Sequence, residues 1–303
     1  MEISETHRPK LSVILPSLNE ESRIGVTLQD AVAVFRDRYA SDWELIVVDD
    51  GSRDQTVAVV REFAADCPEL VLISHPKNLG KGAAVRTGVL ASRGELVLYA
   101  DADNATPFSQ YHSLLTGLER GADVACGSRF GNDPGQVRRT LSRRIIAAFF
   151  ATLAKLLVNP GVSDTQCGFK LFRRNAALSL FQQSSEDGYL FDLEILGLAA
   201  LCGIPVAEIP VAWREIPGSS VRLVRDSWRM FVGLFRLRKI LRQQSLLCSQ
   251  WSAADQTQLP DTLLRRNRTD DEFNLLNTQS QIAQSMSAEA MRYLSTRGEA
   301  PVL

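Results

Sequence analysis

Histidine and cysteine are scarce in this sequence, and neither is spaced as a metal site or a catalytic site requires. The three histidines, His7, His75 and His112, lie far apart, which argues against a histidine-dependent hydrolase. The five cysteines include no C-x-x-C pair. Their odd number and wide spacing argue against a zinc site or a disulfide framework, and they indicate a reducing compartment.

Long apolar runs and a strong charge of one sign are also absent. The longest apolar stretch, Ile145 to Val158, is interrupted by Lys155 and is shorter than the about 20 residues that a membrane-spanning helix needs. The polar start of the chain predicts no signal peptide. Because the net charge is only −1 at pH 7, we expect no nucleic-acid partner, and any anion must be bound by a local group of residues.

What the sequence contains is a repeated alternation of strand-like and helix-like segments. With 303 residues, 45% of them hydrophobic, the chain can bury a large core. Five apolar runs are typical of buried strands: Leu11–Leu15, Glu44–Val48, Leu70–Ser74, Leu96–Ala100 and Ala122–Cys126. We expect Asn19 to cap the helix after the first strand, and Ser52 with Gln55 to form a capping box for the next helix. The alternation predicts an α/β fold with a mostly parallel central sheet flanked by helices.

Polar clusters follow these strands, at the edge where parallel α/β sheets bind their ligands. They are Asn19-Glu20, Asp49-Asp50, Gly80-Lys81-Gly82, Asp101 with Asp103, and Ser128-Arg129. Asp101 and Asp103 are two positions apart, so in an extended chain both would face one side and could bind Mg²⁺ or Mn²⁺. Gly80, Lys81 and Gly82 precede a helix and could hold a phosphate on backbone N–H groups. Taken singly, each cluster could also be a turn or a helix cap.

Several short motifs occur together in one order. The sequence carries P-S-L-N-E at Pro16–Glu20, V-V-D-D-G-S at Val47–Ser52, N-L-G-K-G at Asn78–Gly82, D-A-D at Asp101–Asp103 and G-S-R at Gly127–Arg129. Their order and spacing resemble the family 2 glycosyltransferases, whose GT-A fold is Rossmann-like. Later motifs are D-T-Q-C-G-F-K at Asp164–Lys170, F-D-L-E at Phe191–Glu194 and V-A-W-R-E-I-P-G-S at Val211–Ser219. These resemble the dolichyl-phosphate glucose and mannose synthase branch, and the glucosyl form more closely. The resemblance as a whole covers about Lys10 to Arg242.

The resemblance implies roles for individual residues. The donor-binding residues would be Pro16, Leu18, Glu20, Asp50, Gly80, Lys81 and Asp101. The cofactor would be Mg²⁺ or Mn²⁺ held by Asp101 and Asp103, and these two residues with Arg129 would be catalytic. The acceptor phosphate would be bound by Arg129, Arg138, Ser142 and Arg143. The polar loop at Asp164–Lys170 adds Lys170 as a phosphate contact and Asp164 as a positioning carboxylate.

Two positions depart from the relatives' pattern. Ala105 stands where some mannose synthases have a further metal ligand, so water or Thr106 would have to replace it. Gly218-Ser219-Ser220 stands where a G-S-K is usual, and Arg222 is the nearest positive substitute. These departures concern the donor sugar and the phosphate contacts rather than the fold.

Two segments, residues 138–158 and 221–242, combine basic residues with aromatic and aliphatic ones. Each could be an amphipathic helix in the headgroup layer of an anionic membrane, or could pack on the catalytic domain with a solvated basic face. Their position beside a lipid-phosphate site favours the membrane. We therefore expect an N-terminal tail over residues 1–10, a GT-A domain with C-terminal amphipathic helices over 11–243, and a polar, flexible extension over 244–303.

Together these features describe an inverting, metal-dependent transferase that moves a hexose, glucose from UDP-glucose, onto a polyprenyl or dolichyl phosphate. The expected partners are a nucleotide-sugar donor, the lipid phosphate and a membrane surface, with the protein peripheral on the cytoplasmic face. Because the acceptor phosphate is already ionised, the reaction needs alignment and charge neutralisation more than a general base. The alternatives are a GDP-mannose-using enzyme, a family 2 transferase acting on a saccharide hydroxyl, and a non-catalytic nucleotide-sugar-binding subunit.

Overall fold

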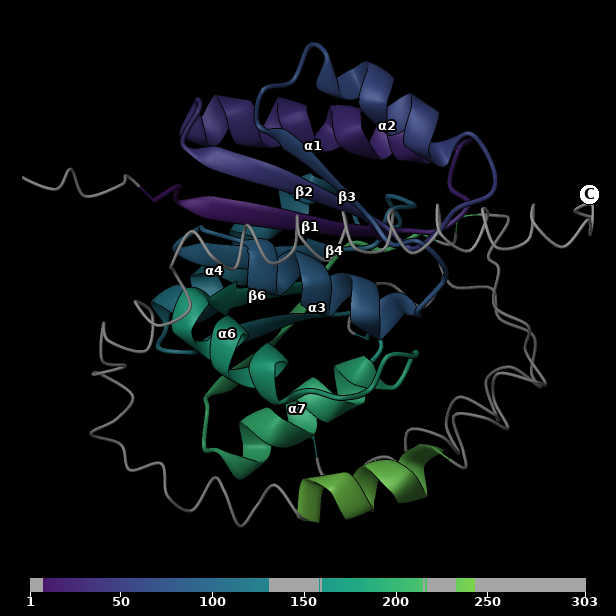
Figure 1. Ribbon diagram of the computed structural model, residues 1–303. Helices are drawn as coiled ribbons and strands as arrows, with labels where there is room; N and C mark the ends of the chain where they lie inside the picture. Colours follow the sequence, from purple (N-terminus) through teal and green to yellow (C-terminus); the bar gives the residue numbers. More distant parts are fainter. Residues whose placement is uncertain (1–7, 131–157, 159, 215, 217–232, 243–303) are drawn as a thin grey trace, which may run out of the picture. The chain divides into compact units, whose positions relative to one another are not determined.

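A computed structural model describes residues 8–130, 158, 160–214, 216 and 233–242 (Figure 1). The chain divides into two compact units, Met1–Gln250 and Trp251–Leu303. All the described residues belong to the first unit. Residues 138–157 of the expected segment 138–158, residues 221–232 of the segment 221–242, and the extension 244–303 lie outside the described residues, as do Arg138, Ser142, Arg143 and Arg222.

A seven-stranded sheet forms the centre of the first unit. Its strands are β1 Leu11–Ser17, β2 Trp43–Asp49, β3 Leu70–Ser74, β4 Leu96–Ala100, β5 Val124–Ser128, β6 Phe169–Arg173 and β7 Val206–Pro210, in the order β3-β2-β1-β4-β6-β5-β7. Neighbouring strands are parallel except around β6, which is antiparallel to both β4 and β5. The predicted mostly parallel α/β sheet is confirmed, and β3 and β4 have the predicted bounds.

Helices cover both faces of the sheet. They are α1 Ile24–Tyr39, α2 Thr56–Ala64, α3 Lys81–Ala91, α4 Tyr111–Glu119, preceded by the short 3-10 helix η1 Phe108–Gln110, α6 Arg174–Gln183 and α7 Phe191–Leu201. Buried side chains of α1, α2 and α4 form one core with the sheet, and those of α3, α6 and α7 form a second core on the other face. Figure 1 shows α1 and α2 on one side of the sheet and α3, α6 and α7 on the other.

The predicted caps of the first two helices are wrong. Asn19 has a φ of 56°, and α1 begins at Ile24 with Arg23 at its N-cap position. The Asn19 side chain instead accepts a hydrogen bond from the backbone N–H of Arg53, and Ser52 Oγ accepts one from the N–H of Asn19. No side-chain cap is formed at Gln55. These polar groups join the β1–α1 and β2–α2 loops to each other, because both loops leave neighbouring strands at the same edge.

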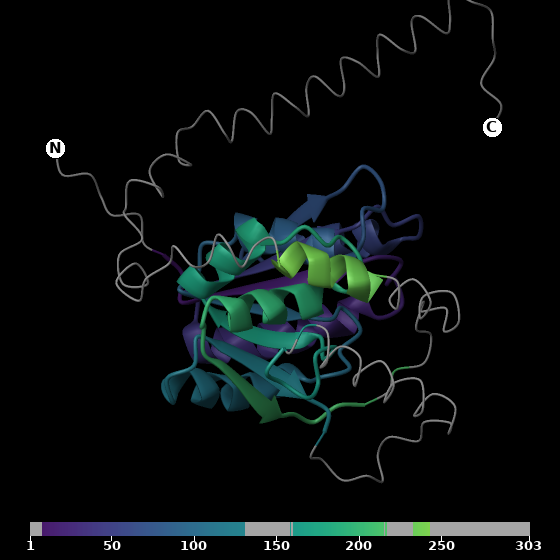
Figure 2. The same ribbon diagram turned by 90° about the horizontal axis from the view of Figure 1, so that it is seen from below.

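Residues 233–242 form a helix on the face that carries α6 and α7 (Figure 2). Leu234, Leu237 and Leu241 are buried in the same core as the apolar residues of α7. For this described part of the segment 221–242, packing on the catalytic domain accounts for the leucines. Among the residues that the structure describes, no helix is long and apolar enough to cross a membrane.

The cysteines only partly match the expectation from the sequence. Cys67, Cys126 and Cys167 are buried, free thiols. Cys202 is disulfide-bonded, which the sequence did not predict.

Candidate active site

A pocket of about 310 Å³ opens at the carboxyl edge of the sheet, and this volume is in the range of small-molecule sites. The strand order reverses between β1 and β4, and such a reversal is where open α/β sheets usually bind their ligands. The pocket is lined by Pro16, Ser17, Leu18, Glu20, Arg23, Asp50, Asn78, Gly80, Lys81, Ala84, Asp101, Ala102, Asp103, Gly188 and Tyr189. All the residues predicted to bind the donor and the metal are thus brought together.

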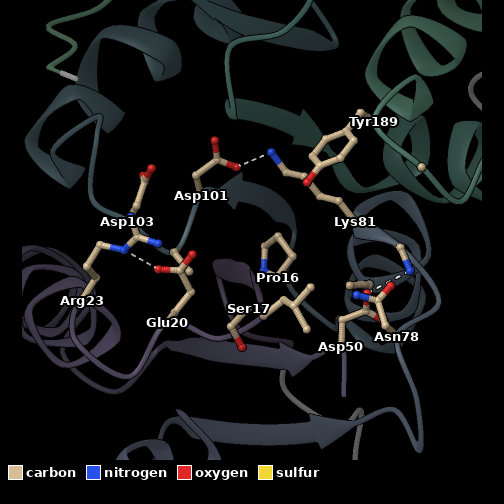
Figure 3. Close-up of a pocket in the computed structure, with 15 residues that line it drawn as sticks. Pro16, Ser17, Glu20, Arg23, Asp50, Asn78, Lys81, Asp101, Asp103 and Tyr189 are labelled. Carbon is tan, nitrogen blue, oxygen red and sulfur yellow. Dashed lines mark hydrogen bonds and ion pairs between the residues drawn. The ribbon is translucent and has the colours of Figure 1, made fainter. Parts of the chain in front are cut away.

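Asp101 and Asp103, the two carboxylates predicted to bind the metal, lie at a turn. The sequence had predicted an extended chain there. β4 ends at Ala100, and Asp103 Oδ1 accepts the N–H of Ala105 across the turn at 3.0 Å. Both carboxylates nevertheless face the pocket (Figure 3). Asp101 Oδ1 lies 2.6 Å from the Lys81 ammonium but accepts no well-directed hydrogen bond among the described residues.

This donor set fits a divalent cation. The described residues include no group of three or more histidine, cysteine or carboxylate side chains that could enclose a metal. Mg²⁺ and Mn²⁺ need no such enclosure, because they are commonly held by one or two carboxylates together with water and the phosphate oxygens of a substrate. Asp101 and Asp103 supply that number of oxygen ligands, and Asp101 Oδ1 has coordination capacity to spare.

Burial raises the pKa of Asp103, and the neighbouring Asp101 carboxylate raises it further. Burial likewise raises the pKa of Glu20, against the opposing effect of its hydrogen bond with Arg23, whose Nε lies 2.6 Å from Glu20 Oε2. The ionised forms therefore cost free energy in the folded protein. A cation bound between these carboxylates would remove that cost.

We expect metal-dependent binding of UDP to weaken as the pH falls through the raised pKa of Asp103, because a protonated carboxyl group is a poor ligand. The free energy of unfolding depends on pH in the opposite direction. In the metal-free protein these groups bind protons more tightly when folded than when unfolded, so their contribution to the free energy of unfolding falls as the pH rises through the folded-state pKa values.

Calorimetry with Mn²⁺ and UDP at neutral and mildly acidic pH tests the first effect. Denaturant unfolding of the wild type and of Glu20→Gln over the same range tests the second, because the difference removes the contribution of other groups. UDP affinity that is independent of pH at limiting Mn²⁺ would contradict the assignment.

The amino end of α3 does not offer the phosphate cradle that the sequence indicated. The N–H of Gly80 donates to Asp50 Oδ2 at 2.8 Å, and the N–H groups of Gly82 and Ala83 both donate to the carbonyl of Asp187. These donors are therefore already used within the protein. The Lys81 side chain instead supplies a positive charge to the pocket. Burial lowers the pKa of its ammonium, but Asp101 and other carboxylates outweigh burial. The pKa is therefore raised and the charge retained.

Asp50 lines the pocket while holding the loop that follows β3. Its Oδ1 accepts hydrogen bonds from the N–H of Leu79 and from His75 Nδ1, and its Oδ2 accepts the N–H of Gly80. The carboxylate is almost fully buried. The predicted contact of Asp50 with the nucleoside stays a prediction, and the loop that Asp50 fixes brings Asn78 to the pocket.

Arg129 lies beside this pocket in a nearly buried ion pair. Its Nε and Nη2 donate to the two carboxylate oxygens of Asp164, each at 2.7 Å, and its backbone N–H donates to the same carboxylate. Its guanidinium lies 5.7 Å from the ring centre of Trp213. Burial favours the neutral forms, but the mutual contact outweighs burial, which raises the pKa of Arg129 and lowers that of Asp164. Asp164 therefore has the positioning contact that the sequence suggested.

Lys170 does not fit its predicted contact with the acceptor phosphate. Its side chain is 1% exposed, and its ammonium donates to Asp192 Oδ1 and to the carbonyls of Cys167 and Thr165. An ammonium has three N–H donors, and all are used by these partners. The polar loop before β6 is only partly buried, since Asp164 and Cys167 are buried and Thr165 and Gln166 are half-buried, and Lys170 on β6 points into the protein.

Sequence reasoning missed several residues of the site, four of which bear on its charge or shape. Arg23 and Tyr189 line the pocket, Trp213 lies against Arg129, and Asp192 pairs with Lys170. Asp192 belongs to the motif at Phe191–Glu194 and Trp213 to the motif at Val211–Ser219. These two motifs could therefore have identified both residues. Arg23 is three positions after Glu20, which is the helical spacing of an ion pair. Nothing in the local sequence marks Tyr189, because only tertiary contacts bring its loop to the pocket.

The family model described as glycosyl transferase family 2 matches residues 12–181. The chain therefore belongs to the family 2 glycosyltransferases. It is 37% identical over 246 residues to the Saccharomyces cerevisiae protein named dolichyl-phosphate beta-glucosyltransferase, covering 75% of this chain and 74% of that protein. It is 40% identical over 227 residues to the Homo sapiens protein of the same name, covering 70% and 69%.

Solved structures agree on the fold. Mannosyl-3-phosphoglycerate synthase from Rubrobacter xylanophilus matches with a TM-score of 0.60 at 24% identity, covering 78% of this chain and 75% of that chain. Glucosyl-3-phosphoglycerate synthase from Mycobacterium tuberculosis, in complex with Mn²⁺, UDP-glucose and phosphoglyceric acid, matches with a TM-score of 0.50 at 24% identity, covering 77% and 80%. The expected GT-A fold is thereby confirmed.

Proposed function

We propose that this enzyme transfers glucose from UDP-glucose to dolichyl phosphate or a similar polyprenyl phosphate, with inversion at the anomeric carbon. The observation that carries the proposal is the pairing of two charged sites. The carboxylates of Asp101 and Asp103 line a pocket with Lys81, and the buried guanidinium of Arg129 lies close enough to Asp101 to interact with its charge. The relatives named dolichyl-phosphate beta-glucosyltransferase support this choice of donor sugar and acceptor.

The donor would lie along the pocket, with its diphosphate toward Asp101, Asp103 and Lys81 and its nucleoside toward Pro16, Leu18 and Asp50. Mg²⁺ or Mn²⁺ held by Asp101 and Asp103 would neutralise the charge that grows on the departing diphosphate. Lys81 adds a positive charge in the same place, so the leaving group is stabilised most where its charge is greatest.

The acceptor phosphate would be bound by Arg129, which Asp164 holds in a fixed orientation. An arginine fixed in this way retains N–H donors for a second anion, and a phosphate oxygen is the group that such donors suit. The phosphate is itself the nucleophile, so the protein has to align it rather than remove a proton. Arg138, Ser142 and Arg143 remain proposed further contacts of this phosphate.

We also propose that the enzyme works at a membrane surface, because a polyprenyl chain stays in the bilayer while its phosphate reacts. The cytoplasmic face, where nucleotide sugars are available, is the proposed side. The domain over 11–243 would suffice for this chemistry, with residues 244–303 as an extension of it.

The direct test offers labelled UDP-glucose, UDP-N-acetylglucosamine and GDP-mannose in turn, with dolichyl phosphate in detergent or in vesicles. We expect label to reach the lipid from UDP-glucose only, and only when Mn²⁺ or Mg²⁺ is present. Transfer from GDP-mannose instead would identify a mannosyltransferase. Transfer to a soluble saccharide but not to the lipid would overturn the proposed acceptor.

A further inference from the structure

Lys170 and Asp192 form a buried ion pair that the proposed reaction does not use. Their charged atoms are 2.6 Å apart, and their side chains are 1% and 4% exposed. Burial lowers the pKa of Lys170, but Asp192 and other groups outweigh this and keep the ammonium charged. A buried pair is rarely retained for stability alone, because apolar residues of similar volume often stabilise a fold as well or better.

On the side of Lys170, the pair fixes the loop that supports Asp101. The Lys170 ammonium donates to the carbonyls of Thr165 and Cys167. The next residue, Gly168, accepts the backbone N–H of Asp101 at 2.9 Å. Gly168 also lies so close to Asp101 that a Cβ at this position would overlap the Asp101 carboxylate. The position of the loop therefore determines where the carboxylate can lie.

On the side of Asp192, the pair holds the first turn of α7, the helix that directly follows the loop over residues 184–190. Asp192 also accepts a hydrogen bond from the hydroxyl of Tyr99, two positions before Asp101 on β4. The Glu194 carboxylate also holds the loop over residues 184–190, because it accepts hydrogen bonds from the N–H groups of Ser185 and Glu186. This loop places Gly188 and Tyr189 in the pocket and the carbonyl of Asp187 on the amino end of α3.

We propose that Lys170 and Asp192 are positioning residues that set the place of the metal-binding carboxylate of Asp101 and hold the loop 184–190 against the donor pocket. Neither residue contacts the substrates. The pair acts through the 165–168 loop on one side and through α7 on the other. This inference rests on the proposed function, since it takes Asp101 as a ligand of the donor-bound metal.

The experiment compares Lys170→Met, Asp192→Asn and the double variant Lys170→Met/Asp192→Leu with the wild type. The double variant replaces the pair by apolar side chains and removes the unpaired buried charge that each single variant leaves. A matched control is Glu44→Gln. Glu44 is a buried carboxylate that accepts hydrogen bonds from Ser12 and Arg93 near the start of β2, at the opposite edge of the sheet.

Three quantities are measured: the thermal midpoint, the Mn²⁺ concentration that half-saturates UDP binding in calorimetry, and hydrogen exchange of the Asp101 amide in the metal-free protein. We expect both single variants to weaken the apparent Mn²⁺ affinity by about tenfold or more, the scale of losing a group that orients a ligand. Exchange at Asp101 should become faster. The double variant should recover the thermal midpoint without recovering Mn²⁺ affinity, and Glu44→Gln should lower the midpoint alone.

A structural role without positioning predicts the opposite pattern, in which Mn²⁺ affinity and thermal midpoint recover together in the double variant. That result, or unchanged Mn²⁺ affinity in Asp192→Asn, would overturn the inference. Binding of UDP by the wild type without any need for Mn²⁺ would instead refute the proposed metal site. Exchange at the Asp101 amide would then still show whether the pair holds this loop.

Discussion

Replacing Asp103 by asparagine is expected to lower kcat/KM for UDP-glucose about a thousandfold, equivalent to ~4 kcal/mol of transition-state stabilisation. The substitution keeps the size of the side chain and an oxygen that can accept the N–H of Ala105, but it removes the negative charge that would hold the cation. Initial rates at several Mn²⁺ concentrations measure the effect.

The same substitution should not destabilise the metal-free protein. Burial and Asp101 raise the pKa of Asp103, so its ionised form costs free energy at neutral pH, and asparagine removes that cost. Asp37→Asn is a suitable control, because Asp37 is exposed on α1 near the helix end that lies away from the pocket. Retained turnover in Asp103→Asn, or equal losses in both variants, would show that the metal site is assigned to the wrong residue.

Replacing Arg129 by alanine should have the second large effect, on the acceptor and on stability together. Asp164 would be left buried at 2% exposure without its partner, and breaking a buried ion pair in this way costs about 3–5 kcal/mol. Use of the lipid phosphate should fall much more than binding of UDP-glucose, since Arg129 is not among the residues that line the donor pocket.

Arg129→Lys separates these two effects. Lysine keeps a positive charge near Asp164 and so should recover most of the stability, but it lacks the planar fork that can bind a carboxylate and a phosphate at once. We expect Arg129→Lys to unfold close to the wild type and still to show a raised KM for dolichyl phosphate. Turnover at varied lipid concentration and calorimetry with UDP-glucose provide the two readouts. Equal losses for donor and acceptor would place Arg129 on the donor side instead.

The sequence predicted the apolar strands well, because each is recognised from a short-range pattern. Leu70–Ser74 and Leu96–Ala100 were delimited correctly because each is an apolar run closed by polar or flexible residues. The donor pocket followed from the rule that loops at one sheet edge converge, which does not depend on the exact shape of any loop. For that reason Asp101 and Asp103 meet in the pocket although they lie on a turn and not in an extended chain.

The sequence failed where partners come from distant parts of the chain. A lysine at the end of a polar loop has the same local pattern whether it faces a ligand or the protein, and Asp192, which decides this for Lys170, is 22 positions away. Asn19 was misread because its partner Arg53 lies on another loop, 34 positions on. β6 was not among the predicted strands, and its antiparallel direction could not be predicted for the same reason, since nothing in Phe169–Arg173 itself specifies the strands beside it.

The position of β6 has a consequence for how the protein is synthesised. β4 pairs with β1 on one side and with β6 on the other. During translation, β4 is therefore an unpaired edge strand until residues 169–173 have left the ribosome. Exposed apolar edge strands invite pairing with other chains. The nascent chain thus passes through a stage in which the part that binds nucleotide can already be folded, while the turn with the two aspartates borders an unfinished sheet. Chaperone demand should be greatest during this interval, and it should end when β6 closes the sheet.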